Sequence, residues 1–135
     1  MMTSEQRNHL IHMRIEQAEK AITQVEFCLK NNQLDMAANR VYYGMFYALL
    51  ALGLLKGFET SKHLQLIGWF NKTFVFTEVF PKQFTRLLKD AFDTRTDADY
   101  KVNKIPTATE IEASLADMKL FISTIKAWIE AHPAT

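Results

Sequence analysis

The chain has 135 residues, which suits one compact domain with a real hydrophobic core and leaves little room for a second domain. Its 16 basic and 15 acidic side chains nearly cancel, so the strong positive field of proteins that bind nucleic acid mainly through phosphate charge is absent. The four glycines are not clustered as a phosphate-binding loop requires. We therefore predict a single domain over residues 1–135, in which any contact with a nucleotide is local.

The composition also bears on location. Cys28 is the only cysteine, so it cannot form a bridge within the chain, and a small buried side chain in a reducing cytosol is expected. The first residues lack the basic start and apolar run of a signal peptide. The longest apolar run, residues 41–55, has 15 residues, fewer than the roughly 20 that span a bilayer as a helix. We predict a cytoplasmic protein with no contact to membranes.

Two helices are predicted first along the chain. Apolar residues between Ile11 and Leu29 recur at alternating steps of four and three, which predicts a helix over residues 4–30. Asn31 and Asn32 end it, because asparagine tolerates the left-handed conformation. A second helix, over residues 34–56, ends at Gly57 and is apolar nearly all round, so the other helices should surround it.

The next segments are less regular. Ser61 is a suitable N-cap for a third helix that reaches Phe70. Residues 73–80 are rich in aromatic and β-branched side chains, but no second alternating segment exists to pair with a strand there. An irregular linker or an extension of the helix is expected instead. Pro81 suits the first position of a fourth helix, predicted over residues 82–98, and a loop follows over residues 101–106.

The last helix has the clearest signal. Thr107 and Glu110 have the spacing of a capping box, and apolar residues from Ile111 to Ile129 then repeat at steps of four and three. Five helices with short connections and no pair of strands predict an all-α fold, an antiparallel helical bundle around the second helix.

Arg95 lies on the apolar face of the fourth predicted helix. At about 100° per residue it falls within roughly 20° of Phe84, so it points toward the core. Asp99 can pair with it at the i, i+4 spacing, and Tyr100 adds an aromatic ring with a polar tip. Such an arginine is suited to bind a phosphate or stack on a base. The alternative is a structural ion pair that closes the end of the core.

A second arginine opens the apolar run of the second helix. Arg40 lies in line with Gly44 and Ala51, and small residues on this face would let a neighbouring helix or a second copy of the protein approach closely. Arg40 and Tyr43 would then lie at the mouth of a groove, where Arg40 and Arg95 could converge. Alternatively, Arg40 extends to solvent from the end of the helix.

The histidines give weaker signals. His63 follows Lys62 at the predicted start of the third helix, where free backbone amides can meet an anion, although a plain capping turn explains the same residues. His9 and His12 are three residues apart, but two ligands without a nearby carboxylate or cysteine pair do not make a metal site. No histidine lies near Arg95 in the sequence, so proton transfer is not predicted there. We predict no catalytic residue, no metal and no cofactor.

Two segments together resemble the HEPN family, the higher eukaryotes and prokaryotes nucleotide-binding domain. They are the stretch Ala-Ala-Asn-Arg-Val-Tyr-Tyr-Gly-Met-Phe-Tyr-Ala-Leu-Leu over residues 37–50 and Arg-Thr-Asp-Ala-Asp-Tyr over residues 95–100. The order of Ala-x-Arg-x-Tyr-Tyr, Lys-His and Arg-x-x-Ala-Asp-Tyr is similar to that of the small stand-alone prokaryotic branch, and the resemblance covers most of the chain.

The resemblance implies an up-and-down helical bundle that is frequently a homodimer. Members are RNA-cleaving toxins, nucleotide-binding modules, or partners of a minimal nucleotidyltransferase in toxin–antitoxin pairs. Ribonuclease members have a histidine four to six residues after the arginine, whereas this chain has Tyr100 after a four-residue gap. The resemblance therefore carries Arg95, Asp99 and Tyr100 over as a ligand or interface site, with Arg40 and Tyr43 beside them, and leaves ribonuclease activity without its usual histidine.

Three functional hypotheses follow. The first is a cytosolic dimer that binds a nucleotide or RNA, paired with a nucleotidyltransferase-like partner. The second is a non-catalytic interaction module in which Arg95 and Asp99 are purely architectural. The third is a ribonuclease in which Tyr100 or His63 replaces the missing histidine.

Overall fold

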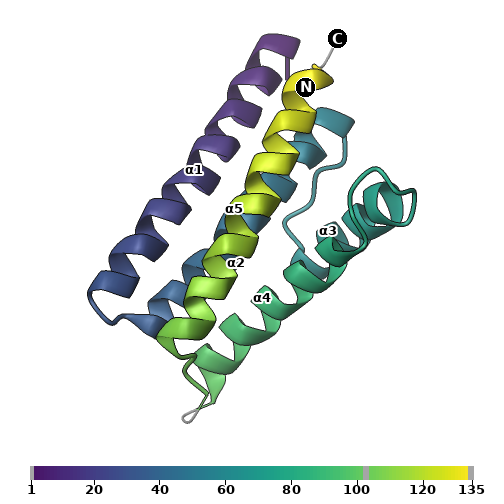
Figure 1. Cartoon of the computed structure of the whole chain (residues 1–135). Helices are drawn as coiled ribbons and strands as arrows, with labels where there is room; N and C mark the ends of the chain where they lie inside the picture. The colour runs from purple at the N-terminus through teal and green to yellow at the C-terminus, as the bar shows by residue number, and fades with distance from the viewer. Residues whose placement is uncertain (1, 102–103, 134–135) are drawn as a thin grey trace.

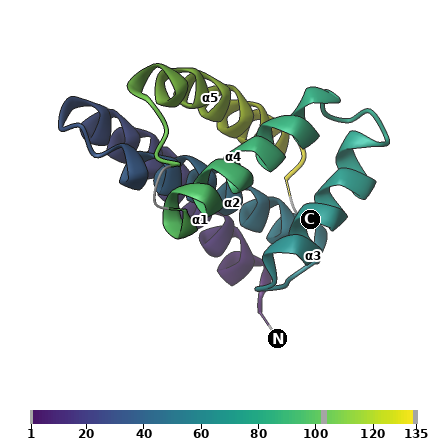
Figure 2. The same ribbon diagram turned by 90° about the horizontal axis from the view of Figure 1, so that it is seen from below.

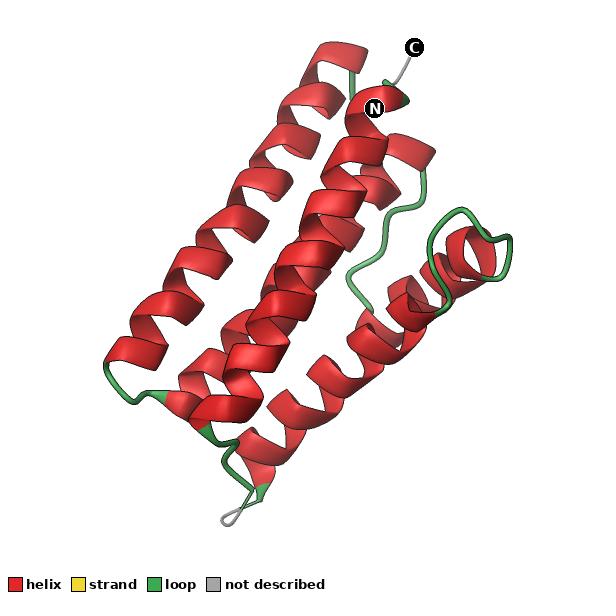
Figure 3. Ribbon diagram, viewed as in Figure 1, coloured by secondary structure: helices red, strands yellow, loops and turns green. Residues whose placement is uncertain are grey.

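The computed structural model describes residues 2–101 and 104–133 of the chain. In these residues five α-helices and one π-helical turn follow one another, and no β-strand is present (Figure 1, Figure 3). The predicted all-α fold is therefore confirmed. The elements are α1 (Ser4–Lys30), α2 (Leu34–Lys56), α3 (His63–Phe70), the π-helical turn η1 (Asn71–Val75), α4 (Gln83–Tyr100) and α5 (Ala108–Ala131).

Helix α2 is the centre of the bundle, as its apolar sequence predicts. It contacts α1, α3, α4 and α5, while α1 and α4 each also pack against α5. The long helices lie side by side in Figure 1, and in Figure 2 α3 lies to one side of them. No helix in the described part of the chain is long and apolar enough to cross a membrane.

Local signals place most helix ends where the sequence predicts them. The side chain of Thr107 accepts a hydrogen bond from the backbone N–H of Glu110, and the Glu110 side chain accepts one in return, so the predicted capping box is present. Asn32 has a φ of 54°, and Gly57, at the end of α2, has a φ of 77°. Both residues adopt the left-handed conformation that asparagine and glycine tolerate best.

Two predicted helix starts are displaced by one residue, and the capping roles given to Ser61 and Pro81 are wrong. Helix α3 begins at His63 with Lys62 at the N-cap, so Ser61 does not cap it. The turn is ordered instead by Thr60, whose hydroxyl oxygen accepts a hydrogen bond from the backbone N–H of Lys62 at 3.1 Å. Helix α4 begins at Gln83, two residues after Pro81, and it continues to Tyr100, beyond the predicted end at residue 98.

The segment over residues 73–80 is neither a strand nor a simple linker. It begins within the π-helical turn, which directly extends α3, and then continues as turns. Phe74 and Phe80 are buried and stack on each other, and the ring of Trp128 from α5 packs edge-on against both. The aromatic residues that are typical of a strand in the sequence therefore pack between helices. The backbone of this segment forms its hydrogen bonds within its own turns.

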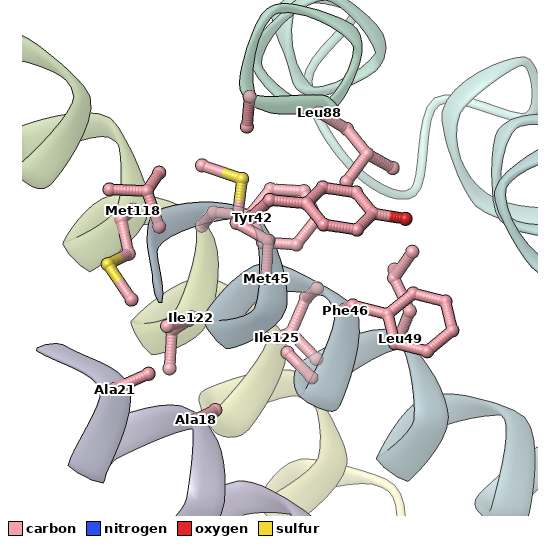
Figure 4. Close-up of a cluster of buried hydrophobic side chains, with 14 of the residues drawn as sticks. Ala18, Ala21, Tyr42, Met45, Phe46, Leu49, Leu88, Met118, Ile122 and Ile125 are labelled. Carbon is pink, nitrogen blue, oxygen red and sulfur yellow. The ribbon is translucent and has the colours of Figure 1, made fainter. Parts of the chain in front are cut away.

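The core forms where α1, α4 and α5 cover α2. Tyr42, Leu88, Met118 and Ile122 are fully buried there. Figure 4 shows Tyr42 among these side chains, with its hydroxyl oxygen projecting out of the cluster. At Gly44 a Cβ atom would overlap the end of Met118 and lie 3.0 Å from the Cβ atom of Ala21. The small residue therefore lets α1 and α5 approach α2, so neighbouring helices of the same chain occupy the face that was predicted to receive a helix or a second copy.

Candidate functional site

The site is built on one turn of α2 that carries two adjacent tyrosines. Tyr42 faces the core and is 0% exposed, whereas Tyr43 is half-buried at the edge of the bundle. Their rings pack edge to face with centres 5.3 Å apart. Because successive residues on a helix point about 100° apart, Tyr42 is enclosed by the core while Tyr43 stays partly accessible.

A sharp reversal after α2 brings the start of α3 back over these tyrosines. Gly57 ends α2 in the left-handed conformation, and the backbone N–H of Phe58 donates to the carbonyl of Gly53 at 2.8 Å. A Cβ atom at Gly53 would overlap the carbonyl oxygen of Phe58, so only glycine permits this close return of the chain. The reversal sets His63, the first residue of α3, against the side chains of α2.

His63 is held by both stacking and hydrogen bonding. Its ring stacks on Phe46 with centres 4.1 Å apart and an angle of 14° between planes. Its Nδ1 atom shares a hydrogen bond of 2.8 Å with the hydroxyl of Tyr42. Two contacts of different kinds therefore fix both the position and the rotation of the imidazole ring.

Arg95 approaches from α4. The side chain is 20% exposed, and its guanidinium lies 5.3 Å from the centre of the Tyr43 ring and 5.7 Å from that of Tyr42. One terminal nitrogen, Nη2, donates to the hydroxyl of Tyr43 at 3.4 Å. The arginine therefore points inward against aromatic rings, as the helical pattern predicts, but the rings belong to α2.

The predicted ion pair between Arg95 and Asp99 is present. Nε of Arg95 lies 3.0 Å from Oδ2 of Asp99, yet its N–H does not point at that oxygen, and Nε is buried without a hydrogen-bond acceptor in the described residues. The contact is thus a charge pair without a well-formed hydrogen bond. The other terminal nitrogen, Nη1, makes no hydrogen bond within the described part of the chain, so Arg95 retains unused donor capacity.

These side chains surround a shallow pocket of about 490 Å³ between α2, the start of α3 and α4. Its walls include Tyr43, Phe92 and Leu64, and its polar groups come from Lys62, His63, Gln65 and Arg95. No carboxylate is among the residues that line it. The pocket therefore combines apolar walls with cationic and neutral hydrogen-bonding groups, which suits an anion that carries an aromatic or apolar part.

Burial changes the acid–base properties of two of these groups. Burial, together with the nearby Arg95 charge, lowers the pKa of His63 below its usual value. Burial, with a smaller contribution from Tyr43, raises the pKa of Tyr42 well above its usual range, and Arg95 partly opposes that rise. Both groups are therefore neutral at neutral pH.

The structure brings together only some of the residues singled out in the sequence. Arg95, Tyr43 and His63 line one pocket, and Asp99 pairs with Arg95 without lining that pocket. Tyr100 is 78% exposed and does not line the pocket, so its ring lies apart from the side chains that surround Arg95. Helix α4 directs residues 99 and 100 to different sides, because they are adjacent in a helix.

Arg40 contacts the site through the ring of Tyr43. Its guanidinium lies 5.4 Å from the centre of the Tyr43 ring, on which Arg95 also packs. Its Nε and Nη2 atoms donate to the side-chain oxygen of Asn39, and Nη1 donates to that of Gln24 at 3.4 Å. The two arginines thus converge on Tyr43, but Arg40 lines the neighbouring groove between α1 and α2.

Tyr42 and Phe92 belong to the site and were not singled out from the sequence. Phe92 lines the pocket and packs edge-on against Tyr42, with ring centres 5.4 Å apart. Both look like ordinary core residues in a helical pattern, and the only signal is the place of Tyr42 in the Tyr-Tyr pair of the family resemblance. The proximity of His63 to Arg95 was also missed, because these residues are far apart along the chain and meet only through the fold.

No group of three or more histidine, cysteine, aspartate or glutamate side chains in the described residues could hold a metal ion. His12 pairs with Glu16 at 2.8 Å on the exposed face of α1. Cys28 is buried, as its place in the pattern predicts.

This helical bundle, with its arginine and tyrosine pairs, can be compared with known families. A family model of the HEPN domain matches residues 11–128. The chain belongs to the HEPN family. The matched residues of this HEPN-domain protein include all of α2, α3 and α4, and hence every side chain of the pocket.

Individual relatives carry the name UPF0332 protein. The HEPN-domain protein is 36% identical to a UPF0332 protein of Thermotoga maritima over 83 residues, which cover 62% of this chain and 63% of that protein. The match therefore spans less than two thirds of that relative's length. It is 32% identical to a UPF0332 protein of Pyrococcus horikoshii over 121 residues, covering 85% of this chain and 84% of that protein.

A third relative has a more informative name. The chain is 30% identical over 115 residues to a Methanocaldococcus jannaschii protein named "Putative toxin MJ0142", and the match covers 85% of this chain and 78% of that protein.

Proposed function

We propose that this HEPN-domain protein binds a phosphate-bearing ligand, a nucleotide or a segment of RNA, in the pocket beside Arg95. The observation that carries the proposal is the state of Arg95. Its side chain is held in place by Tyr43 and Asp99, yet Nη1 has no hydrogen-bond acceptor in the described residues. A planar, permanently charged guanidinium with free donors matches the oxygen atoms of a phosphate.

The rest of the pocket supports this choice of ligand. Lys62 adds a second cation, His63 adds a ring nitrogen, and Tyr43 and Phe92 offer aromatic surface on which a base can stack. The chain carries a formal net charge of only +1, so binding depends on this local arrangement of donors.

The test is a titration of the purified protein with a fluorescently labelled RNA oligonucleotide and, separately, with AMP. Replacing Arg95 with alanine should weaken binding by roughly 10- to 150-fold, because a hydrogen-bonded charge contact contributes about 1.5–3 kcal/mol. The matched control is Arg86→Ala, since Arg86 lies on the same helix with its side chain 84% exposed and does not line the pocket. Equal affinity in wild-type protein and the Arg95 variant contradicts the proposal, provided that circular dichroism shows unchanged helical content.

The same titration separates the proposal from a purely architectural role. If Arg95 and Asp99 serve only an interaction module, neither RNA nor AMP binds the wild-type protein. In that case Arg95→Ala would lower the stability of the protein, and there would be no ligand affinity for it to change.

We further propose that the protein acts within a pair, as a homodimer beside a nucleotidyltransferase-like partner. The relative named as a toxin and the resemblance to toxin–antitoxin members of the family support this arrangement. Light scattering should give twice the mass of one chain. Mass spectrometry of tagged protein purified from its native cell should find a nucleotidyltransferase-like companion, and a monomer with no such companion contradicts the pairing.

A second candidate function is RNA cleavage with His63 in place of the missing histidine. The observation that favours it is that His63 and Arg95 line the same pocket, while Tyr100 lies outside it. In this reaction Nε2 of His63 would take the proton of a ribose 2′-hydroxyl, and the 2′-oxygen would bond to the adjacent phosphorus. The bond from phosphorus to the 5′-oxygen would break, and that oxygen would take a proton from water.

This second function is tested by incubating the protein with labelled RNA. Cleavage that disappears in both His63→Ala and Arg95→Ala, but persists in Arg86→Ala, would support it. Intact RNA after incubation with the wild-type protein would exclude it.

A further inference from the structure

We propose that Tyr42 fixes His63 in the tautomer that carries its proton on Nε2, so that His63 offers a neutral N–H donor to a phosphate oxygen in the pocket. The identity of the ligand rests on the proposed function above. The state of the histidine rests on the geometry of Tyr42 and His63. It makes His63 a binding group and Tyr42 the residue that positions it.

The proton of the Tyr42 hydroxyl determines which tautomer His63 adopts. The side chain is 0% exposed, and the only hydrogen-bond partner of this hydroxyl in the described residues is Nδ1 of His63, at 2.8 Å. If Nδ1 carried a proton and donated it to the hydroxyl oxygen, the phenolic proton would have no acceptor. A buried donor without an acceptor is strongly disfavoured. The Tyr42 O–H therefore donates to a bare Nδ1, and the imidazole proton lies on Nε2.

The orientation of the ring leads to the same arrangement. Phe46 stacks on one face of the imidazole with centres 4.1 Å apart, and the Tyr43 ring meets it edge to face at 5.8 Å. Turning the ring over would place a carbon atom opposite the Tyr42 hydroxyl and leave that hydroxyl unpaired. Nε2 forms no hydrogen bond within the described residues, and His63 lines the pocket, so Nε2–H is available to a ligand.

The charges around His63 favour this neutral form. Tyr42 and Tyr43 face it from α2, Arg95 faces it from α4, and Lys62 precedes it in the chain. Burial and the Arg95 charge lower the pKa of His63, while burial raises that of Tyr42. A second proton on the ring would also displace the hydrogen bond from Tyr42. The histidine thus stays neutral at neutral pH and its tautomer is set by one neighbour.

The consequence for the ligand is specific. A neutral imidazole with a proton on Nε2 cannot accept a proton at that atom, whereas it can donate a hydrogen bond to an anionic oxygen. With Arg95 and Lys62 it forms a set of three donors around the pocket. This arrangement favours binding of phosphate over cleavage of RNA, which would need a bare Nε2.

The tautomer can be measured directly. In 15N-labelled protein at neutral pH, long-range proton–nitrogen spectra should show a bare Nδ1 and a protonated Nε2 for His63. The substitution Tyr42→Phe should produce a mixture of tautomers, because it removes only the hydroxyl. Tyr47→Phe is the matched control, since Tyr47 lies on the same helix outside the pocket. A protonated Nδ1 with a bare Nε2 in wild-type protein would overturn the proposal.

The role in binding is tested with inorganic phosphate and with the labelled RNA. His63→Gln places an amide N–H near the position of Nε2 and should retain most of the affinity. His63→Ala should lose about tenfold. Equal loss in both variants would overturn the donor role, because glutamine preserves a donor.

The two proposals fail in different ways. If Arg95→Ala weakens binding but the spectra show a bare Nε2, the assignment of His63 is wrong while the phosphate site stands. If Nε2 is protonated but neither phosphate nor RNA binds, the ligand assignment is wrong for both His63 and Arg95.

Discussion

The guanidinium of Arg95 packs on the ring of Tyr43, with 5.3 Å between its central carbon and the ring centre, and donates to the Tyr43 hydroxyl at 3.4 Å. This contact joins α4 to α2 across 52 positions of the sequence. The planar guanidinium of Arg95 is thus held by the Tyr43 ring on one side and by Asp99 along its edge. The arginine is therefore oriented before any ligand arrives, which reduces the entropy lost on binding.

This orientation predicts that a positive charge at position 95 is not sufficient for full ligand affinity. Arg95→Lys keeps the positive charge but loses the planar fork and the stacking on Tyr43. We expect the affinity for labelled RNA to fall between those of wild-type protein and Arg95→Ala in anisotropy titrations. An affinity equal to that of the wild type would mean that the site responds only to net charge.

The ion pair between Arg95 and Asp99 should contribute more to stability than ion pairs on the open face of α4. We expect Asp99→Asn to lower the free energy of unfolding by about 1 kcal/mol, because the Arg95 partner is largely shielded from water. In Asp90→Asn the change should stay within about 0.5 kcal/mol, since Arg86 and Asp90 are exposed. Urea unfolding measures both values, and equal effects in the two variants would contradict this ranking.

The turn that returns the chain from α2 to His63 depends on the left-handed conformation of Gly57. Gly57→Ala should destabilise the protein by about 1 kcal/mol, because alanine is strained at a φ of 77°. At Gly68, within α3, a Cβ atom would likewise meet nothing within 4 Å, but φ is not positive there. Gly68→Ala should stabilise the protein by about 0.5–1 kcal/mol, as expected for an exposed helical position. Thermal unfolding should therefore shift in opposite directions for the two variants.

The lowered pKa of His63 predicts a dependence of stability on pH. In the unfolded chain the pKa of this histidine is close to its ordinary value of 6.5, whereas in the folded protein the lowered pKa means that it takes up a proton only at lower pH. The unfolded state therefore binds more protons as the pH falls below about 6.5, and the folded state loses stability there. The loss should be absent from His63→Gln when urea unfolding is compared between about pH 5 and pH 7.5. Parallel curves for the two proteins would show that His63 does not titrate differently on folding.

Much of the fold could be predicted from local patterns in the sequence. The alternating steps of four and three define α1 and α5, and the capping box at Thr107 and the left-handed Gly57 mark helix ends. These signals are local, because a helix bonds to itself within four residues. The caps of α3 and α4 were placed wrongly, and the expected extension of the third helix forms as a π-helical turn, whose Phe74 stacks on Phe80.

The candidate site likewise has some contacts that the sequence determines and others that depend on the tertiary structure. The pairing of Arg95 with Asp99 follows from their spacing on one helix, so the sequence by itself determined it. The tertiary structure alone decided that His63 meets Tyr42 and that Arg95 packs on Tyr43. Contacts between residues 21 or 52 positions apart depend on how the helices cross and how the chain returns between them. No periodic pattern within one helix contains that information, because it describes only which side of the helix is buried.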